Sequence, residues 1–247
     1  MENKGNLGHM HPLSQVITQT TKIFKDLGFV VADGPELEDS FHNFDALNIP
    51  DDHPARDMQD TFWVKPLSSK KLMRTHTSSV QVRYLEANKD NLPIKIVIPG
   101  KVFRNEATDS THEAQFFQIE GLYIDKEVSV AHLKGTLEYF LKNLYGSDTQ
   151  IRLRPSFFAF VEPGFEVDIS CFKCKGAGCS LCKQTGWIEV LGAGLVHSNV
   201  LKAVGIDPEE WQGFAFGCGI DRLAMMKFGI DDIRNFYSGD LRFINQF

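Results

Sequence analysis

The spacing of apolar side chains predicts three helices. Residues 12–27 form the first, and Gly28 is placed to end it. Residues 79–88 form the second helix, and residues 128–145 form the third. The apolar residues of the third helix lie on one side, at Leu133, Leu137, Phe140, Leu141 and Leu144. Such a pattern indicates a helix that packs one face against a core.

Short runs of β-branched and aromatic residues predict that most of the remaining chain is strand. The segment FVVADGP, 29–35, predicts a strand that Pro35 ends. Residues 36–60 are rich in Asp, Asn, His and Pro, which predicts mostly loop. The other predicted strands are 94–98, 101–106, 115–124, 150–154, 157–162, 165–169, 186–192 and 213–217.

The order of these elements indicates the fold class. Parallel strands need long crossover connections, usually helices, and few long helices separate the predicted strands. The sequence therefore predicts an α+β fold, with an antiparallel sheet and helices packed on one side of it. We find no internal repeat or low-complexity linker, and we expect one domain over residues 1–247.

Composition narrows the class of protein. With 43% apolar and 23% charged residues, the chain has the composition of a soluble globular protein. No apolar stretch approaches the roughly 20 residues that span a bilayer. The N-terminus shows no apolar signal segment, so we expect a cytoplasmic protein without a membrane partner. The net charge of −6 indicates that any contact with nucleic acid is local or shared with a partner.

Four of the five cysteines form the pattern C-x2-C-x4-C-x2-C within CFKCKGAGCSLC, 171–182. This spacing suits one tetrahedral Zn²⁺ bound by Cys171, Cys174, Cys179 and Cys182. Four thiolates close the coordination shell, so the pattern favours a structural zinc over a catalytic one. Reduced cysteines without metal are the alternative. The chemistry is therefore expected elsewhere, and the remaining cysteine, Cys218, is expected to be a small buried apolar residue.

Several predicted strands place polar and aromatic side chains on one face, because side chains of equal parity share a face. Each pair alone has a plain structural explanation, such as a surface ion pair, core aromatics or a tight turn, and His76 is equally explained as a residue of a capping loop. Together they predict one concave surface with aromatic walls, a guanidinium group and carboxylates. The groups are Arg104 with Glu106; Phe116, Gln118 and Glu120; Phe158, Phe160 and Glu162; and Ala215 with Gly217.

The order of these segments resembles the three motifs of class II aminoacyl-tRNA synthetases. The first helix, the strand and Pro35 are similar to motif 1, which forms the dimer interface in that family. FRNEATDSTHEAQFFQIE, 103–120, is similar to motif 2, and GCGIDR, 217–222, is similar to motif 3. Within the class, the chain resembles the bacterial phenylalanyl-tRNA synthetase α-subunit family. That resemblance rests on HNFDALNIPDDHPARDMQDTFW, LMRTHTSSVQVR, IRLRPSFFAFVEPGFEVD, GWIEVLGAG and GFAFGCGIDRLAM.

The resemblance implies a fold and a reaction. The implied fold is an antiparallel sheet flanked by helices, with the four-cysteine knuckle inserted in a hairpin at 171–182. The implied reaction activates L-phenylalanine with ATP to phenylalanyl-adenylate and then transfers the acyl group to tRNA(Phe). The first step needs positioning and positive charge rather than a general base, because the attacking carboxylate is already ionised.

The resemblance also implies how ATP is held. Arg104 holds the α-phosphate, and Phe116 and Arg222 sandwich the adenine between a ring face and a guanidinium plane. Glu106 and His112 fix the adenine and the outer phosphates. We therefore expect Arg104 and Arg222 to be catalytic.

The implied amino-acid pocket is polar at one end and apolar at the other. Gln118 and Glu120 take the α-ammonium group, helped by His76 and Ser78. Aromatic edges contact the substrate ring, and small residues set the depth of the pocket. The residues expected in these two roles are Phe158, Phe160, Ala215 and Gly217.

The implied cofactor is Mg²⁺, which Glu189 helps to hold. The implied partners are tRNA(Phe) and a β subunit, which carries the editing site, in an α2β2 heterotetramer. The resemblance runs from about residue 9 to Phe247, so we expect the family's N-terminal coiled-coil arm to be missing. Three residues depart from the family pattern: Asp221 stands for Glu, Cys218 for a larger apolar residue, and Ser198 for Pro.

Other functions stay open at this point. A related class II enzyme for phosphoserine or a lysine analogue is disfavoured by the apolar Phe158, Phe160 and Ala215, because a phosphate would need cations in the pocket. A non-catalytic nucleotide-binding paralogue is disfavoured because Arg104 and Arg222 are both present. A zinc-ribbon nucleic-acid binder is the least favoured, since we do not expect the knuckle to present the basic and aromatic surface that such proteins use.

Overall fold

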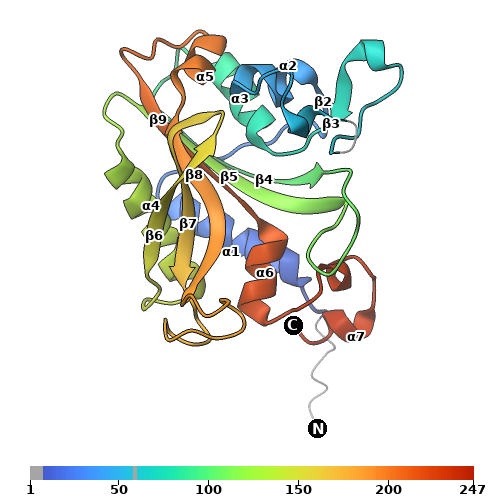
Figure 1. The fold of residues 1–247 in the computed structure, drawn as a ribbon. Helices are drawn as coiled ribbons and strands as arrows, with labels where there is room; N and C mark the ends of the chain where they lie inside the picture. Colours follow the sequence, from blue (N-terminus) through green and yellow to red (C-terminus); the bar gives the residue numbers. More distant parts are fainter. Residues whose placement is uncertain (1–7, 58–59) are drawn as a thin grey trace.

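The computed structural model describes residues 8–57 and 60–247, which are built around one seven-stranded sheet (Figure 1). Residues 1–7 of the N-terminal segment and residues 58–59 of the predicted loop lie outside the described residues. The strand order is β1-β4-β5-β9-β8-β7-β6. These strands are β1 (Val30–Val31), β4 (Ile94–Phe103), β5 (Gln115–Asp125), β6 (Ile151–Phe158), β7 (Val161–Ser170), β8 (Trp187–Val196) and β9 (Gln212–Gly219).

The sheet is antiparallel except at one edge, where β1 pairs with β4 in parallel. The sequence predicts two strands on either side of Pro99, but the structure has the single strand β4. β1 is only two residues long and ends before it reaches Pro99. β4 is therefore an edge strand at that point, where proline is tolerated.

The three predicted helices are confirmed as α1 (Pro12–Asp26), α3 (Ser78–Asn88) and α4 (Val130–Tyr145). Gly28 follows α1 with a φ of +83°, the left-handed conformation that often ends a helix. None of the helices among the described residues has the length and apolar character needed to cross a bilayer. The remaining helical segments are α2 (Ser40–Asn43), α5 (Ser198–Ala203), α6 (Ile220–Phe228) and α7 (Leu241–Ile244), with 3₁₀ turns at η1 (Asp45–Leu47), η2 (Pro54–Arg56), η3 (Leu67–Ser69) and η4 (Ile233–Phe236).

Helices cover both faces of the sheet, so the expectation that they pack on one side is wrong. Figure 1 shows α2, α3 and α5 at one side of the sheet and α1 and α6 at the other. β4 feeds both cores because its side chains alternate. Val97 joins the core that includes Phe24 of α1 and Phe140 of α4. Ile96 joins the core that includes Val80 of α3 and the α5 residues.

Two further predictions of secondary structure are wrong, one of a strand and one of a loop. Residues 157–162 are not one strand, because β6 ends at Phe158 and β7 begins at Val161. The sequence there has no glycine, proline or asparagine to mark the tight turn. The predicted loop 36–60 contains α2, two 3₁₀ turns and the short strand β2 (Leu37–Asp39), which pairs with β3 (Lys71–Met73).

Candidate active site

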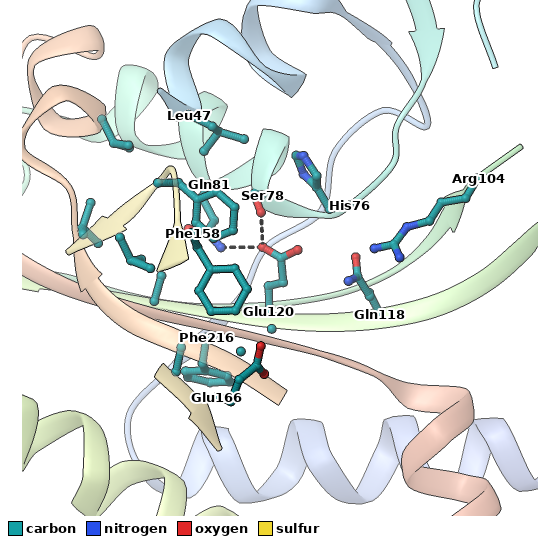
Figure 2. Close-up of a pocket in the computed structure, with 18 residues that line it drawn as sticks. Leu47, His76, Ser78, Gln81, Arg104, Gln118, Glu120, Phe158, Glu166 and Phe216 are labelled. Carbon is teal, nitrogen blue, oxygen red and sulfur yellow. Dashed lines mark hydrogen bonds between the residues drawn. The ribbon is translucent and has the colours of Figure 1, made fainter. Parts of the chain in front are cut away.

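A cavity of about 310 Å³ lies between the sheet and α3 (Figure 2). The strands β5, β7, β8 and β9 supply its floor and walls, and the chain that leads into α3 supplies its roof. The structure gathers here every residue that was predicted for the amino-acid pocket, together with Arg104. These lining residues are His76, Ser78, Arg104, Gln118, Glu120, Phe158, Phe160, Ala215 and Gly217.

The carboxylate of Glu120 is the most heavily hydrogen-bonded group in the cavity. The side chain is buried on β5, and it accepts bonds from Ser78 Oγ at 2.6 Å and Gln81 Nε2 at 2.7 Å (Figure 2). The backbone N–H of Thr77 donates a third bond at 3.1 Å. Burial nevertheless raises the pKa of Glu120, and these donors only partly offset that effect. The carboxylate is therefore held in place for a cation to join it.

Two buried polar groups at the cavity lack well-formed hydrogen bonds. They are both ring nitrogens of His76 and the amide oxygen of Gln118. Burial, and then the charge of Arg104, lower the pKa of His76 to about 3, so its ring is neutral at physiological pH. Buried polar atoms are almost always paired in folded proteins. The missing hydrogen-bond partners of these atoms point to a polar ligand in this cavity.

The guanidinium of Arg104 lies just beyond the end of β4. Its Nε donates to the Thr75 carbonyl at 3.3 Å, and its Cζ lies 5.0 Å from the centre of the Phe116 ring. The prediction that Arg104 and Glu106 share a strand face is wrong, because β4 ends at Phe103 and Glu106 lies exposed in the following loop. Arg104 itself reaches the cavity, with its cationic end beside Gln118 in Figure 2.

The other end of the cavity is apolar. The rings of Phe158 and Phe160 stack, with centroids 5.9 Å apart and planes at 26°. They reach the cavity from the end of β6 and the following turn rather than from one strand. Glu162, predicted on the same face, is largely exposed and does not line the cavity. A Cβ at Gly217 would lie 2.9 Å from Cγ of Glu120, so the carboxylate requires glycine there.

Five residues predicted for the ATP site or the Mg²⁺ site lie outside the cavity lining, and one of them is Phe116, whose ring contacts Arg104. Glu106 and His112 are exposed in the loop between β4 and β5, where the His112 ring contacts Asp109 at 3.0 Å. Arg222 is exposed at the start of α6, and its Nη2 donates to the Glu189 carbonyl at 2.9 Å. The Glu189 carboxylate accepts from Arg154 Nη2 at 3.0 Å.

The sequence analysis missed two polar residues that line the cavity. Gln81 follows Ser78 by three residues on α3, so helical spacing could have placed both on one face. Glu166 lies on β7, and its side chain accepts from Ser156 Oγ at 3.3 Å. Burial, and then the charge of Glu189, raise the pKa of Glu166. Glu166 and Glu189 thus form an acidic pair beside the cavity.

The four cysteines of the predicted metal site converge. Their sulfur atoms all lie within 4.8 Å of one another, and the closest pairs are 3.7 to 3.8 Å apart. Backbone N–H groups also point at the sulfurs, from Gly178 to Cys174 at 3.2 Å and from Gly186 to Cys182 at 3.3 Å. Such N–H donors stabilise thiolates, which are the form of cysteine that binds metals.

The three residues that depart from the family pattern lie at or near the starts of α5 and α6. Asp221 is buried at the start of α6, where it accepts from the Phe117 N–H at 2.7 Å and from the Tyr237 hydroxyl at 2.5 Å. Burial raises the pKa of Asp221 to about 6, and both hydrogen bonds act against that rise. Cys218 is buried in the core, as expected. Ser198 opens α5 directly after its cap, His197.

Comparisons with known proteins agree with this geometry. Residues 2–247 match the family described as tRNA synthetases class II core domain (F). The phenylalanine–tRNA ligase alpha subunit of Bacillus subtilis (strain 168) is 56% identical over 241 residues, which cover 98% of this chain and 69% of the relative. The subunit of the same name from Bacillus mycoides (strain KBAB4) is 57% identical over 240 residues, covering 97% and 69%.

A solved structure shares the fold at low sequence identity. The pyrrolysyl-tRNA synthetase of Desulfitobacterium hafniense superposes with a TM-score of 0.69 at 16% identity, over 93% of this chain and 74% of that chain. At this identity the match shows the fold alone. The predicted α+β architecture, a sheet flanked by helices, is confirmed.

Proposed function

The chain belongs to the class II tRNA synthetase core-domain family and, within it, to the phenylalanine–tRNA ligase alpha subunits, and from this we propose how its cavity carries out the reaction. It is a ligase, the catalytic subunit that activates L-phenylalanine with ATP and passes the acyl group to tRNA(Phe). We propose that the whole of residues 1–247 forms this one catalytic domain.

One observation carries the assignment of the cavity to phenylalanine. A buried carboxylate, Glu120, shares a cavity of about 310 Å³ with the stacked rings of Phe158 and Phe160. An ammonium group beside Glu120 would offset the cost of burying its charge. An aromatic side chain would then extend toward the two phenylalanines. Gln118, His76 and Ser78 complete the polar end, and Ala215 and Gly217 limit the depth.

The activation step is a displacement at phosphorus. An oxygen of the phenylalanine carboxylate bonds to the α-phosphorus of ATP, and the bond to pyrophosphate breaks. Negative charge builds on the α-phosphate oxygens, and Arg104 is the cation that lines the cavity. Glu120 and Gln118 fix the amino acid by its ammonium group, so that its carboxylate is directed toward Arg104.

The nucleotide is assigned to residues outside the cavity lining, of which Phe116 contacts the lining residue Arg104. We propose that Phe116 and Arg222 enclose the adenine, and that Glu106 and His112 move with their exposed loop to contact the adenine and the outer phosphates. The carboxylates of Glu166 and Glu189 suit a hard divalent cation, which would relieve the repulsion by which Glu189 raises the pKa of Glu166. We propose that Glu189 helps to hold Mg²⁺, which when bound neutralises phosphate charge.

The cysteine cluster is assigned to a structural Zn²⁺. A tetrahedral ion with Zn–S bonds of about 2.3 Å places its sulfurs about 3.8 Å apart. The sulfur pairs at 3.7 to 3.8 Å fit that edge length. Cys171, Cys174, Cys179 and Cys182 would fill the coordination shell, so the ion would hold β7 and β8 together without entering the reaction.

The partners follow from the subunit name of the relatives. We propose that the chain assembles with a phenylalanyl-tRNA synthetase β subunit, as α2β2, and acts on tRNA(Phe). We also propose a cytoplasmic location, because that is where the proposed reaction supplies protein synthesis.

The test is phenylalanine-dependent exchange of pyrophosphate into ATP. It reports the first step alone, and it needs no tRNA. We expect exchange with phenylalanine that is much faster than with tyrosine or phosphoserine. Equal or faster exchange with phosphoserine would contradict the assignment of the cavity. If the chain assembled with its β subunit shows no exchange with any amino acid, the proposed activity is contradicted.

A further inference from the structure

The connection between β7 and β8 carries a surface that the reaction above does not use. We call residues 171–186 the knuckle. Its basic and its large apolar exposed side chains are Phe172, Lys173, Lys175, Leu181 and Lys183. The expectation that the knuckle lacks a basic and aromatic surface is therefore wrong. Trp187 stands at its base with the guanidinium carbon of Arg152 4.5 Å from the ring centre, and Arg152 is itself paired with Asp168 at 2.7 Å.

The charge of the knuckle differs from that of the chain. The whole chain has a net charge of −6, yet the knuckle has three lysines and no acidic residue. Within the described part of the chain, none of these lysines forms an ion pair. Four thiolates around one Zn²⁺ would bring a charge of −2 to the interior of the knuckle, which leaves the segment net positive.

Two of the lysines stand at related positions. Lys175 and Lys183 each follow the second cysteine of a C-x2-C pair, and both have a φ of +51°. Glycine adopts this left-handed conformation freely, whereas it costs free energy for any other ordinary L-residue. Lysine at both positions therefore places a charged side chain where a turn alone would favour glycine. The repeat directs two cations outward from the same kind of turn.

The knuckle lies at the far end of the strands that form the cavity. β8 runs from Trp187, beside the knuckle, to Gly192 and Ala193, which line the cavity. At about 3.3 Å per residue, Trp187 lies roughly 17 Å along β8 from Gly192. A nucleic acid whose end enters the cavity extends well beyond that distance. Figure 1 shows the knuckle as an open loop at the end of the β7–β8 pair.

We propose that the knuckle surface binds the sugar-phosphate backbone of the tRNA whose 3′ end enters the cavity. The proposal rests on the proposed function, which supplies the polyanion. Lysine ammonium groups bind phosphates as point charges, and an exposed ring such as Phe172 can stack on an unpaired base or sugar face. Charge favours RNA over a protein partner, because the knuckle exposes three lysines and no acidic residue, and Phe172 and Leu181 are its only large exposed apolar side chains among the described residues. The metal would shape the surface, and the lysines would contact the RNA.

The test replaces Lys173, Lys175 and Lys183 together by alanine, in the chain assembled with its β subunit. The probe is a fluorescent tRNA(Phe) transcript, whose Kd is measured by anisotropy at several salt concentrations. We expect the Kd to rise about tenfold near 0.1 M salt, and the slope of log Kd against log salt to fall by about 2. Phenylalanine-dependent pyrophosphate exchange should stay within about twofold of the parent, because the lysines do not line the cavity.

Two matched variants separate charge from fold. Replacing Lys89, Lys134 and Lys202 by alanine removes the same charge from exposed positions elsewhere, and the tRNA Kd should then change less than about twofold. Replacing the three knuckle lysines by arginine keeps the charge and should keep the Kd. An unchanged Kd and salt slope in the alanine variant would overturn the proposal. So would a loss of assembly with the β subunit at unchanged tRNA affinity, which would make the knuckle a protein contact.

The binding assay stands apart from the proposed activity. If the parent binds tRNA but exchanges no pyrophosphate, the activity fails while the knuckle variants still report on RNA contact. If the parent exchanges pyrophosphate and the alanine variant binds tRNA as tightly as the parent, the knuckle proposal alone fails.

Discussion

The cavity and the knuckle hold their polar groups in opposite ways. In the cavity, Glu120 is buried on a central strand and fixed by three donors from the start of α3, and His76 turns unpaired nitrogens inward. In the knuckle, the backbone turns around four sulfurs, and the charged side chains point out to solvent. One region is shaped by the packing of a sheet, and the other depends on four sulfur atoms.

This difference indicates where each region is sensitive. A substitution in the cavity should change the reaction and leave the fold intact, because strands β4, β5 and β9 are held by long ladders of hydrogen bonds and by two buried cores. A substitution in the sulfur cluster should first change the fold of the loop that carries it.

Arg104→Ala should have the largest effect. Arg104 lines the cavity, and its charge is needed most where the α-phosphate gains charge in the transition state. Removing one such contact typically lowers the rate by about 10² to 10³, or about 2.7 to 4 kcal/mol. We expect that loss in the rate constant for phenylalanine-dependent exchange, with a melting temperature close to the parent's.

Arg104→Lys is the matched control for charge. It retains the positive charge but loses the planar fork, so its exchange rate should fall between those of the parent and the alanine variant. An alanine variant that exchanges within a few-fold of the parent would remove Arg104 from the chemistry.

Cys174→Ser tests the opposite region. A serine oxygen is a poor replacement for a thiolate at zinc, so the variant should lose one equivalent of the metal by elemental analysis. Loss of about 2 kcal/mol would lower Tm by roughly 4 to 8 °C in a chain of this size. Because no cysteine of the cluster lines the cavity, exchange by protein that remains folded should change less than about tenfold.

Ser180→Ala is the control for Cys174→Ser. Ser180 is exposed in the same loop and offers no sulfur, so zinc content and Tm should match the parent. The assignment of the four cysteines to a structural Zn²⁺ fails if the parent, reduced and purified without chelator, contains no zinc. It also fails if Cys174→Ser stays folded but loses exchange by several orders of magnitude.

The residues predicted for the amino-acid pocket come together in one cavity, but not all of the strands predicted to carry them form. All eight residues expected for the amino acid line the cavity, although the parity argument placed Phe158, Phe160 and Glu162 on a strand that does not exist. Phe158 and Phe160 still converge, because the tight turn between β6 and β7 sets them side by side. The resemblance to a family carried these positions, whereas periodicity alone did not.

What the sequence could not supply was long-range pairing. The parallel contact of β1 with β4 joins segments about 66 residues apart, and the β2–β3 pair joins segments about 34 apart. Neither has a local signal. The sequence also does not show which side chains face solvent and which line a cavity. For this reason the exposed lysines of the knuckle were not recognised as a surface, and Glu166 was not predicted in the cavity. The partners of a side chain depend on segments that are distant in sequence and that the fold brings next to it.

Ala215→Gly sharpens the description of the cavity. Ala215 sits on β9 between Leu122 and Gly194, and its methyl group is part of the lining. Removing it should admit phenylalanines with a para substituent, such as chlorine. One methyl group in such a pocket is worth about 1 to 3 kcal/mol of discrimination, or about 10- to 200-fold in relative exchange efficiency.

Ala193→Gly is the control for that variant, since Ala193 lies on β8 beside the cavity but its methyl group packs in the core on the opposite face of the sheet. If Ala215 sets the depth, only Ala215→Gly should change the ratio of para-chlorophenylalanine to phenylalanine exchange. Equal changes in both variants would show that a general loosening of the sheet, and not the loss of this one methyl group, admits the larger ring.

Asp221 tests a third kind of buried polar group, one whose partners all come from the chain itself. Burial raises its pKa to about 6 in the folded protein, from 3.8 in an exposed carboxyl, while the Tyr237 and Phe117 hydrogen bonds act against that rise. Because the folded pKa is the higher one, the folded state binds a proton that the unfolded state does not bind between these values. This group therefore favours folding more as pH falls through about 6, and less as pH rises.

The measurement is Tm against pH for the parent and Asp221→Asn, which cannot titrate. Taking the difference cancels other groups, such as His76, whose pKa is lowered to about 3 by burial and which opposes folding as pH falls. From pH 7 to pH 5 the parent should gain about 1.4 kcal/mol on the variant, or roughly 3 to 5 °C. Tyr237→Phe removes a donor that stabilises the carboxylate, so it should move the midpoint of this gain to higher pH. Parallel curves for parent and Asp221→Asn would show that Asp221 keeps its charge across this range, and that its two donors, rather than burial, dominate its pKa.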